Sequence, residues 1–310
     1  MPKNTSSQSK GNEEQELPFI VTNKAAAICV VAAVILLVSG IMWWKQVYNH
    51  PRRVFEGMLN NSLSLNSITR STVSDGYGGK TEKVEQLSFV PDAAVRTWVA
   101  IDQPAENGSS KVKTETIGTR NQDFSRYLSI DTSQTGENGK KLDYSSALNT
   151  WGRTSAGTPP EYYQQSILGI VPFAQVPATR HQDAVKAFSD SRVYEVDYAK
   201  VEPKRINGKS ALVIPVKVHL QQYLTVFKRV AKDSGLNDFE AVNPDEYSDS
   251  APVEVKLTID KISRNLLEIR YEGEPAQVES FSGHGLSLPI KAPEQTILLE
   301  QLQQKLQSIK

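Results

Sequence analysis

Residues 193–219 read VYEVDYAKVEPKRINGKSALVIPVKVH and predict two antiparallel strands joined by a tight turn. Strand-forming residues fill 193–201 and 210–219. Between them, Asn207 and Gly208 form the Asn-Gly pair that two-residue hairpin turns favour, because both turn positions need a positive φ. This is the strongest hairpin signal in the chain.

Strand patterns continue on both sides of the hairpin. Apolar and polar residues alternate most clearly over 253–259, and 267–271 follows after a turn. The remaining strands are expected at 84–90, 95–101, 112–118, 124–130, 277–281 and 286–290. This order indicates an antiparallel meander with an insertion at about 136–187, where the period of two is lost.

Apolar residues at helical spacing mark four amphipathic helices around this sheet. They are expected over 54–65, around 162–168, over 221–232 and over 294–309. A separate helix is predicted from Ala25 to Trp44, where twenty residues carry no charge and are long enough to cross a bilayer. The predicted fold class is therefore α+β: an N-terminal transmembrane helix, then an antiparallel, half-barrel-like β-sheet wrapped around amphipathic helices.

The chain is expected to divide into four parts. These are a disordered polar tail (1–23), a transmembrane helix (24–45), a β-rich domain outside the cytoplasm (46–292) and a C-terminal amphipathic helix (293–310). Lysine and arginine lie on both sides of the apolar helix, so their distribution does not set its orientation. Because the C-terminal part is rich in strands and free of cysteine, we expect a single-pass protein of the cell membrane with a cytoplasmic N-terminus and an extracellular domain.

Composition argues against several classes of function. The chain has 35 basic and 35 acidic residues, and a neutral domain does not suit nucleic-acid binding, which needs a basic surface. Phosphate-binding and dinucleotide motifs are absent from the sequence, and the four histidines lack the spacing of metal ligands. We therefore expect no cofactor, no metal and no enzyme activity. An envelope enzyme acting on glycans through paired carboxylates stays open as an alternative.

The pattern resembles the LolA and LppX/LprG-type exported lipid-binding proteins, which are half-barrels that hold amphiphilic ligands. The helix Val54–Leu65 leading into strands, the segment Val201–Ile214 with its Asn-Gly turn, and Val253–Tyr271 carry the resemblance. A transmembrane helix stands here in place of the family's lipidated cysteine. The resemblance therefore implies that a lipid is bound, sensed or handed on at the membrane.

Four aromatic residues are the candidates for lining an apolar groove between sheet and helices: Phe55, Trp98, Tyr223 and Phe227. Each is also the kind of residue that fills an ordinary core. The competing hypothesis is an interaction or structural module of the cell envelope, which binds other envelope proteins and has a filled interior. The expected partners are thus the membrane, through Ala25 to Trp44, and either an amphiphile or envelope proteins.

Overall fold

The structure is a computed structural model, which describes residues 23–43, 48–76, 79–105, 108–136, 139–233, 239, 242–273, 277–286 and 289–309. The chain divides into two compact units, residues 1–48 and 49–310, and each is described by itself. The predicted polar tail lies outside the described residues except for Asn23. Trp44, at the end of the predicted membrane segment, also lies outside them.

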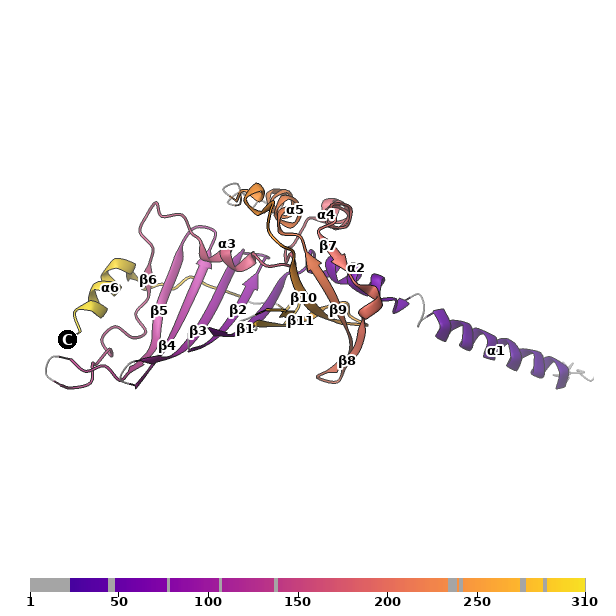
Figure 1. The fold of residues 1–310 in the computed structure, drawn as a ribbon, viewed down its shortest axis with the longest axis horizontal. Coiled ribbons are helices and arrows are strands. Elements are labelled where there is room, and N and C mark those ends of the chain that lie inside the picture. The colour runs from indigo at the N-terminus through magenta and orange to yellow at the C-terminus, as the bar shows by residue number, and fades with distance from the viewer. Residues whose placement is uncertain are drawn as a thin grey trace, which may run out of the picture. The chain divides into compact units, whose positions relative to one another are not determined.

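Helix α1 (Asn23–Trp43) occupies the first unit and is coloured indigo in Figure 1. No Asp, Glu, Lys or Arg occurs from Ala25 to Trp43, and the ring of Trp43 lies 6.2 Å from that of Tyr48. Side chains are described from Val30 onward. Within the described residues, no helix combines the length and apolar composition that crossing a membrane requires.

The second unit contains the amphipathic helices. Within the described ranges they are α2 (Pro51–Ser62), α3 (Tyr162–Ile167), α4 (Ala178–Asp190), α5 (Leu220–Asp233) and α6 (Leu299–Gln307). The predictions over 54–65, 162–168 and 221–232 are confirmed by α2, α3 and α5. Helix α2 begins earlier than its apolar pattern, because Pro51 suits the first helical position and His50 accepts a hydrogen bond from the Arg52 amide at 3.3 Å.

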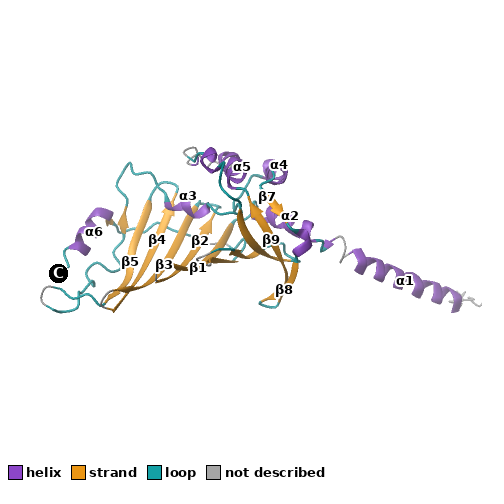
Figure 2. Ribbon diagram, viewed as in Figure 1, coloured by secondary structure: helices purple, strands orange, loops and turns teal. Residues whose placement is uncertain are grey.

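One large sheet forms the body of the unit (Figure 2). Its strands are β1 (Ser67–Gly76), β2 (Gly79–Ser88), β3 (Ala94–Ala105), β4 (Gly108–Thr119), β5 (Asp123–Thr132), β6 (Gly152–Arg153), β7 (Tyr194–Val196), β8 (Glu202–Ile206), β9 (Lys209–Val218), β10 (Val253–Asp260), β11 (Leu266–Tyr271), β12 (Gln277–Ser282) and β13 (Ile297–Leu298). Short 3-10 turns lie at Tyr198–Lys200 and Pro244–Tyr247.

The sheet is open, and its order is β13-β6-β5-β4-β3-β2-β1-β12-β11-β10-β9-β7, with β8 also paired to β9. Its described pairings are antiparallel except that of β13 with β6. The prediction of an α+β domain with a large antiparallel sheet and amphipathic helices is therefore confirmed, and the open sheet fits a half-barrel. Strand β12 joins the two halves because it lies between β1 and β11.

The predicted hairpin is present at β8 and β9. Asn207 and Gly208 have φ values of 49° and 78°, as the two-residue turn requires. The first predicted strand, however, is split into β7 and β8. Asp197 accepts a hydrogen bond from the Ala199 amide at 3.1 Å and so stabilises a 3-10 turn between them.

The core lies between helices α2, α4 and α5 and one face of β9 to β12. The three helices and strands β9 and β10 are labelled in Figure 1. Alternate residues of β9 and β10 point into it, and Ile214, Val218 and Leu257 have no exposed surface. From the helices, Val54 and Phe188 are equally buried. The periodicities of two and 3.6 that predict the elements therefore also identify the faces that meet.

Three further differences separate prediction and structure. Helix α4 begins within the predicted insertion and is not predicted, because two of its three buried residues are alanines and its apolar stripe is weak. The described residues of the predicted strand 286–290 form no strand, and Pro289 there cannot donate to a ladder. The C-terminal helix begins only at Leu299, since Ile297 and Leu298 pair with β6 instead.

Candidate ligand site between the helices and the sheet

Aromatic rings form a continuous row between the helices and the sheet. The ring centroids of Phe55 and Tyr194 are 5.5 Å apart, and those of Phe188 and Tyr223 are 5.9 Å apart. Adjacent rings elsewhere in the row are separated by 5.0 to 6.3 Å, which is contact distance for aromatic pairs. This aromatic row consists of Phe55, Tyr194, Phe188, Tyr223, Phe227 and Phe239.

Helix α5 supplies the middle of the aromatic row. Its buried residues include Tyr223, Val226, Phe227 and Val230, whose spacing of three and four places them on one face. The other face carries exposed polar residues such as Thr225. Helix α5 is therefore strongly amphipathic, and its apolar face closes over the sheet.

The structure brings together three of the four candidate groove residues. Phe55, Tyr223 and Phe227 belong to one buried cluster, and each exposes 5% or less of its surface. Trp98 does not join them. Its ring stacks under Arg96, whose guanidinium carbon lies 4.7 Å from the ring centroid, and both residues lie on the opposite sheet face. A groove at these residues stays a prediction.

A polar floor continues from the aromatic row across β1 and β2. Arg70 Nε donates to Glu85 Oε2 at 2.7 Å, and an Arg70 terminal nitrogen donates to the Ser166 carbonyl at 2.7 Å. Ser166 Oγ and Lys83 reach the other Glu85 oxygen at 2.8 and 2.7 Å. Burial raises the pKa of Glu85, but the positive charges of Arg70 and Lys83 and these hydrogen bonds lower it more, so the net shift is downward.

A second carboxylate lies on the same face of the neighbouring strand. Glu279 in β12 is buried and accepts hydrogen bonds from Tyr271 Oη and Gln277 Nε2, each at 3.1 Å. In the β1–β12 ladder, Arg70 lies opposite Phe281 and Thr72 lies opposite Glu279, so Arg70 and Glu279 are diagonal neighbours. The polar floor is thus defined by Arg70, Glu85, Ser166, Tyr271 and Glu279.

The hydroxyl of Tyr223 lies at the boundary between the aromatic row and the polar floor. It is buried and has no hydrogen-bond partner among the described residues. Burial raises its pKa far above the ordinary tyrosine value, the nearby Tyr271 phenol raises it further, and the Arg70 charge opposes the shift. The pKa of Tyr271 is also raised, by burial and by Glu279. Both phenols therefore carry their protons at neutral pH.

An ion network occupies the opposite face of β3, β4 and β5. Glu115 is almost completely buried and receives Arg96 Nε at 2.5 Å and Arg126 Nε at 2.7 Å. Each arginine also lies over a tryptophan: Arg96 over Trp98, and Arg126 over Trp151 at 4.6 Å. The Glu115 carboxylate is thus paired with both arginines, and Arg96 also covers the ring of Trp98.

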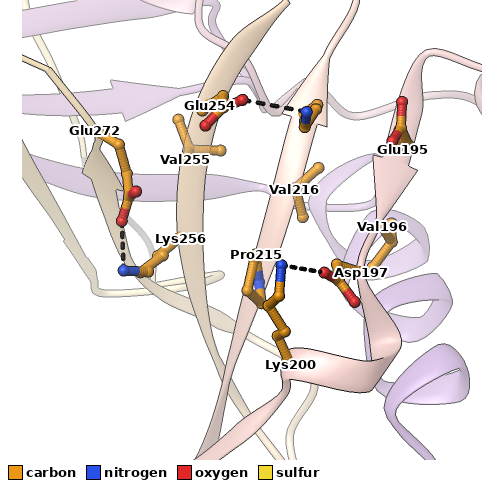
Figure 3. Close-up of a pocket in the computed structure, with 11 residues that line it drawn as sticks. Glu195, Val196, Asp197, Lys200, Pro215, Val216, Glu254, Val255, Lys256 and Glu272 are labelled. Carbon is orange, nitrogen blue, oxygen red and sulfur yellow. Dashed lines mark ion pairs between the residues drawn. The ribbon is translucent and has the colours of Figure 1, made fainter.

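A pocket with a volume of about 600 Å³ lies on the same opposite face, over β7, β9 and β10 (Figure 3). Its charged side chains alternate with Val216 and Val255, which point into the core. The charges are paired, as in Lys200 with Asp197 at 3.1 Å, Lys217 with Glu254 at 3.2 Å, and Lys256 with Glu272. Such a lining does not suit an apolar ligand. Within the described residues, no three or more acidic, histidine or cysteine side chains are grouped to hold a metal ion.

Comparison with known proteins gives matches of structure only. No protein-family model matches the sequence, and no curated protein matches it. LprF from Mycobacterium bovis is 10% identical over 78% of this chain and 96% of its own, with a TM-score of 0.42. MucB is 12% identical over 79% of this chain and 64% of its own, with a TM-score of 0.32.

A third match is a LolA superfamily protein from Nitrosomonas europaea. It is 8% identical over 77% of this chain and 94% of its own, with a TM-score of 0.22. A protein of the LolA superfamily is therefore among the solved structures to which this chain is similar. No family, role or ligand is transferred from these proteins to this chain.

Proposed function

We propose that this protein binds a lipid or another amphiphile between helix α5 and the sheet. The observation that carries the proposal is the continuous apolar layer beneath α5, which is lined by the aromatic row and bordered by the polar floor. An amphiphile has the same division into an apolar chain and a polar end. Helix α5 follows β9 directly, and a shift of this helix away from the sheet would open the apolar layer to a ligand.

The free energy needed to lift α5 from the sheet is similar to the free energy gained by burying an acyl chain in its place. Helix α5 buries four large apolar side chains, at about 1.5 to 3 kcal/mol each, so lifting it costs roughly 6 to 12 kcal/mol. Burying an acyl chain of about 16 carbons contributes approximately 0.8 kcal/mol per CH₂, or about 12 kcal/mol, relative to the chain in water. A free acyl chain can therefore replace the contacts of α5 with the sheet, whereas a small polar molecule cannot.

Membrane attachment is part of the same proposal. The uncharged segment Ala25 to Trp44 would anchor the protein once in the cell membrane, with the N-terminus in the cytoplasm and the domain outside. The site would then lie next to its lipid source, and the anchored protein would bind or hand on lipid locally. Extraction of membranes at high pH and protease protection of intact cells test the anchor and its orientation.

A second candidate function is supported by the close packing of the aromatic row. Phe55, Tyr223 and Phe227 are nearly inaccessible, and their rings touch neighbouring rings, as in a permanently filled core. In that case the domain would be an interaction or structural module of the cell envelope. It would then bind other proteins through its surface and would take up no amphiphile.

Photocrosslinking distinguishes the two functions. The full-length chain is reconstituted into vesicles that contain a phospholipid with a diazirine in the middle of one acyl chain, and the adducts are mapped by mass spectrometry. Binding beneath α5 predicts adducts on Tyr223, Phe227 and neighbouring core residues in addition to those on residues 25–44. Adducts confined to residues 25–44 would reject lipid binding by the domain. Thr225, on the exposed face of α5, serves as the internal control for non-specific labelling.

A further inference from the structure

The hydroxyl of Tyr223 lacks an explanation in terms of folding. The side chain exposes 2% of its surface, and its ring is held between Phe188 and Phe227. A buried hydroxyl without a partner costs about 1 to 3 kcal/mol, and a phenylalanine would fill the same space without that cost. The position therefore indicates a polar group supplied by a ligand.

Glu279 has unused hydrogen-bonding capacity on the polar floor. Both of its described donors, Tyr271 and Gln277, reach Oε1, and none of the described hydrogen bonds reaches Oε2. No basic side chain forms an ion pair with Glu279 among the described residues. A carboxylate accepts hydrogen bonds at both oxygens, so Oε2 is available to a donor from a ligand.

The three polar side chains are connected through the buried cluster and one hydrogen bond. Tyr271 and Glu279 are hydrogen-bonded to each other on the core face of β11 and β12, and Tyr271 packs against the buried cluster that contains Tyr223. Arg70 is nearby, but Glu85 and the carbonyls of Ser166 and Leu168 occupy its donors. The available groups are therefore the Tyr223 hydroxyl, the Tyr271 oxygen as an acceptor, and one carboxylate oxygen.

These groups select a neutral hydroxyl. A phosphate or carboxylate would lie against the negative charge of Glu279, and Arg70 is already engaged. An ammonium group could donate to Glu279 but could not accept the Tyr223 proton, so that hydroxyl would stay without a partner. A hydroxyl group can pair with both protein groups, because it can accept a hydrogen bond from the Tyr223 hydroxyl and donate one to Glu279 Oε2.

We propose that Tyr223, Tyr271 and Glu279 form a subsite for a hydroxyl-bearing, uncharged headgroup, such as that of a monoacylglycerol or a glycosylated lipid. The inference rests on the proposed function, since the acyl chain of the same molecule would occupy the space beneath α5. The headgroup would lie inward on the polar floor, and the subsite would set the choice among lipids.

A matched pair of ligands tests the subsite. The full-length chain is held in amphipol, and monooleoylglycerol and methyl oleate, which has the same chain without hydroxyls, compete against a fluorescent acyl probe. The wild-type chain is expected to bind monooleoylglycerol at least about tenfold more tightly than methyl oleate, since two hydrogen bonds to buried groups are at stake. Tyr223→Phe and Glu279→Gln should each bring this ratio close to one, because each variant removes one of the two hydrogen bonds that distinguish the ligands.

Tyr194→Phe is the control variant, because the Tyr194 hydroxyl has its own partner in the Ile170 carbonyl and should not affect the ratio. Equal binding of the two ligands by the wild type, or an unchanged ratio in both variants, would overturn the subsite but leave lipid binding intact. Tighter binding of oleylamine or oleate than of monooleoylglycerol would also overturn it. Failure to bind any of these ligands would overturn the proposed function as well.

Discussion

Replacing Tyr223 by phenylalanine is expected to stabilise the domain. The change removes only the hydroxyl, and the ring keeps its contacts with Phe188 at 5.9 Å and Phe227 at 5.7 Å. The lost oxygen is a buried group without a partner, whose desolvation costs about 1 to 3 kcal/mol in the folded state. The small void left behind costs only a few tenths of a kcal/mol, at about 24 cal/mol per Å³. We expect a net gain of about 1 to 2 kcal/mol.

Thermal unfolding of the full-length chain in a mild detergent, followed by intrinsic fluorescence, measures this gain. For a domain of this size, 1 to 2 kcal/mol corresponds to a rise in Tm of roughly 2 to 8 °C. Tyr194→Phe is the reference, because the Tyr194 hydroxyl donates to the Ile170 carbonyl at 2.8 Å and its loss should cost about 0.5 to 1.5 kcal/mol. The two variants should therefore move in opposite directions. If Tyr223→Phe lowers Tm as much as Tyr194→Phe does, its hydroxyl has a partner in the folded protein and the reasoning is refuted.

Three further changes test other parts of the fold. Glu115→Ala leaves two arginines without their shared carboxylate and should lower the free energy of unfolding, measured by urea denaturation, by about 2 to 3 kcal/mol. The loss is smaller than for a fully buried pair because the arginines are partly exposed. A loss below about 0.5 kcal/mol would show that the network is dispensable. Glu85 has a lowered pKa in the folded state, because two neighbouring cations outweigh the effect of its burial. Its stabilising effect is therefore present at neutral pH and is lost as the pH falls below about 4.3. Glu85→Gln should flatten this acid dependence of Tm, and an unchanged profile would contradict the pairing. Gly118→Ala would place a Cβ 2.7 Å from both Tyr162 Cβ and the Tyr163 amide nitrogen, so α3 must shift. The fall in Tm should be equivalent to about 1 to 3 kcal/mol. Unchanged stability would show that α3 is not closely packed against β4.

The parts of the fold that the sequence predicts are those encoded by neighbouring residues. The Asn207-Gly208 turn needs only two residues of the right type, and the apolar face of α5 follows from the spacing of Tyr223 and Phe227. Helix α4 is not predicted, because Ala184 and Ala187 on its buried face give only a weak helical pattern of apolar residues. Its helical structure depends on packing against α2 and α5 rather than on its own pattern.

The candidate site was predictable in its apolar half only. Three aromatic residues chosen from amphipathic patterns do meet in the core, since each lies on the buried face of its element. Trp98 is also a large aromatic residue, but side chains alternate between the two faces of β3, and Trp98 lies on the same face as Arg96. The polar floor could not be anticipated, because Arg70 and Glu279 become neighbours only through the pairing of strands more than 200 residues apart.

The position of β12 has a consequence for biosynthesis. Strand β1 begins at Ser67 and finds its second partner only in residues 277–282, so the central seam of the sheet cannot close until those residues have been made. Closing such a long loop is slow and entropically costly. Until then, β1 and β11 both present unpaired edges. A chain that leaves the ribosome or crosses a membrane in stages would therefore need its edges shielded from other chains until residues 277–282 arrive.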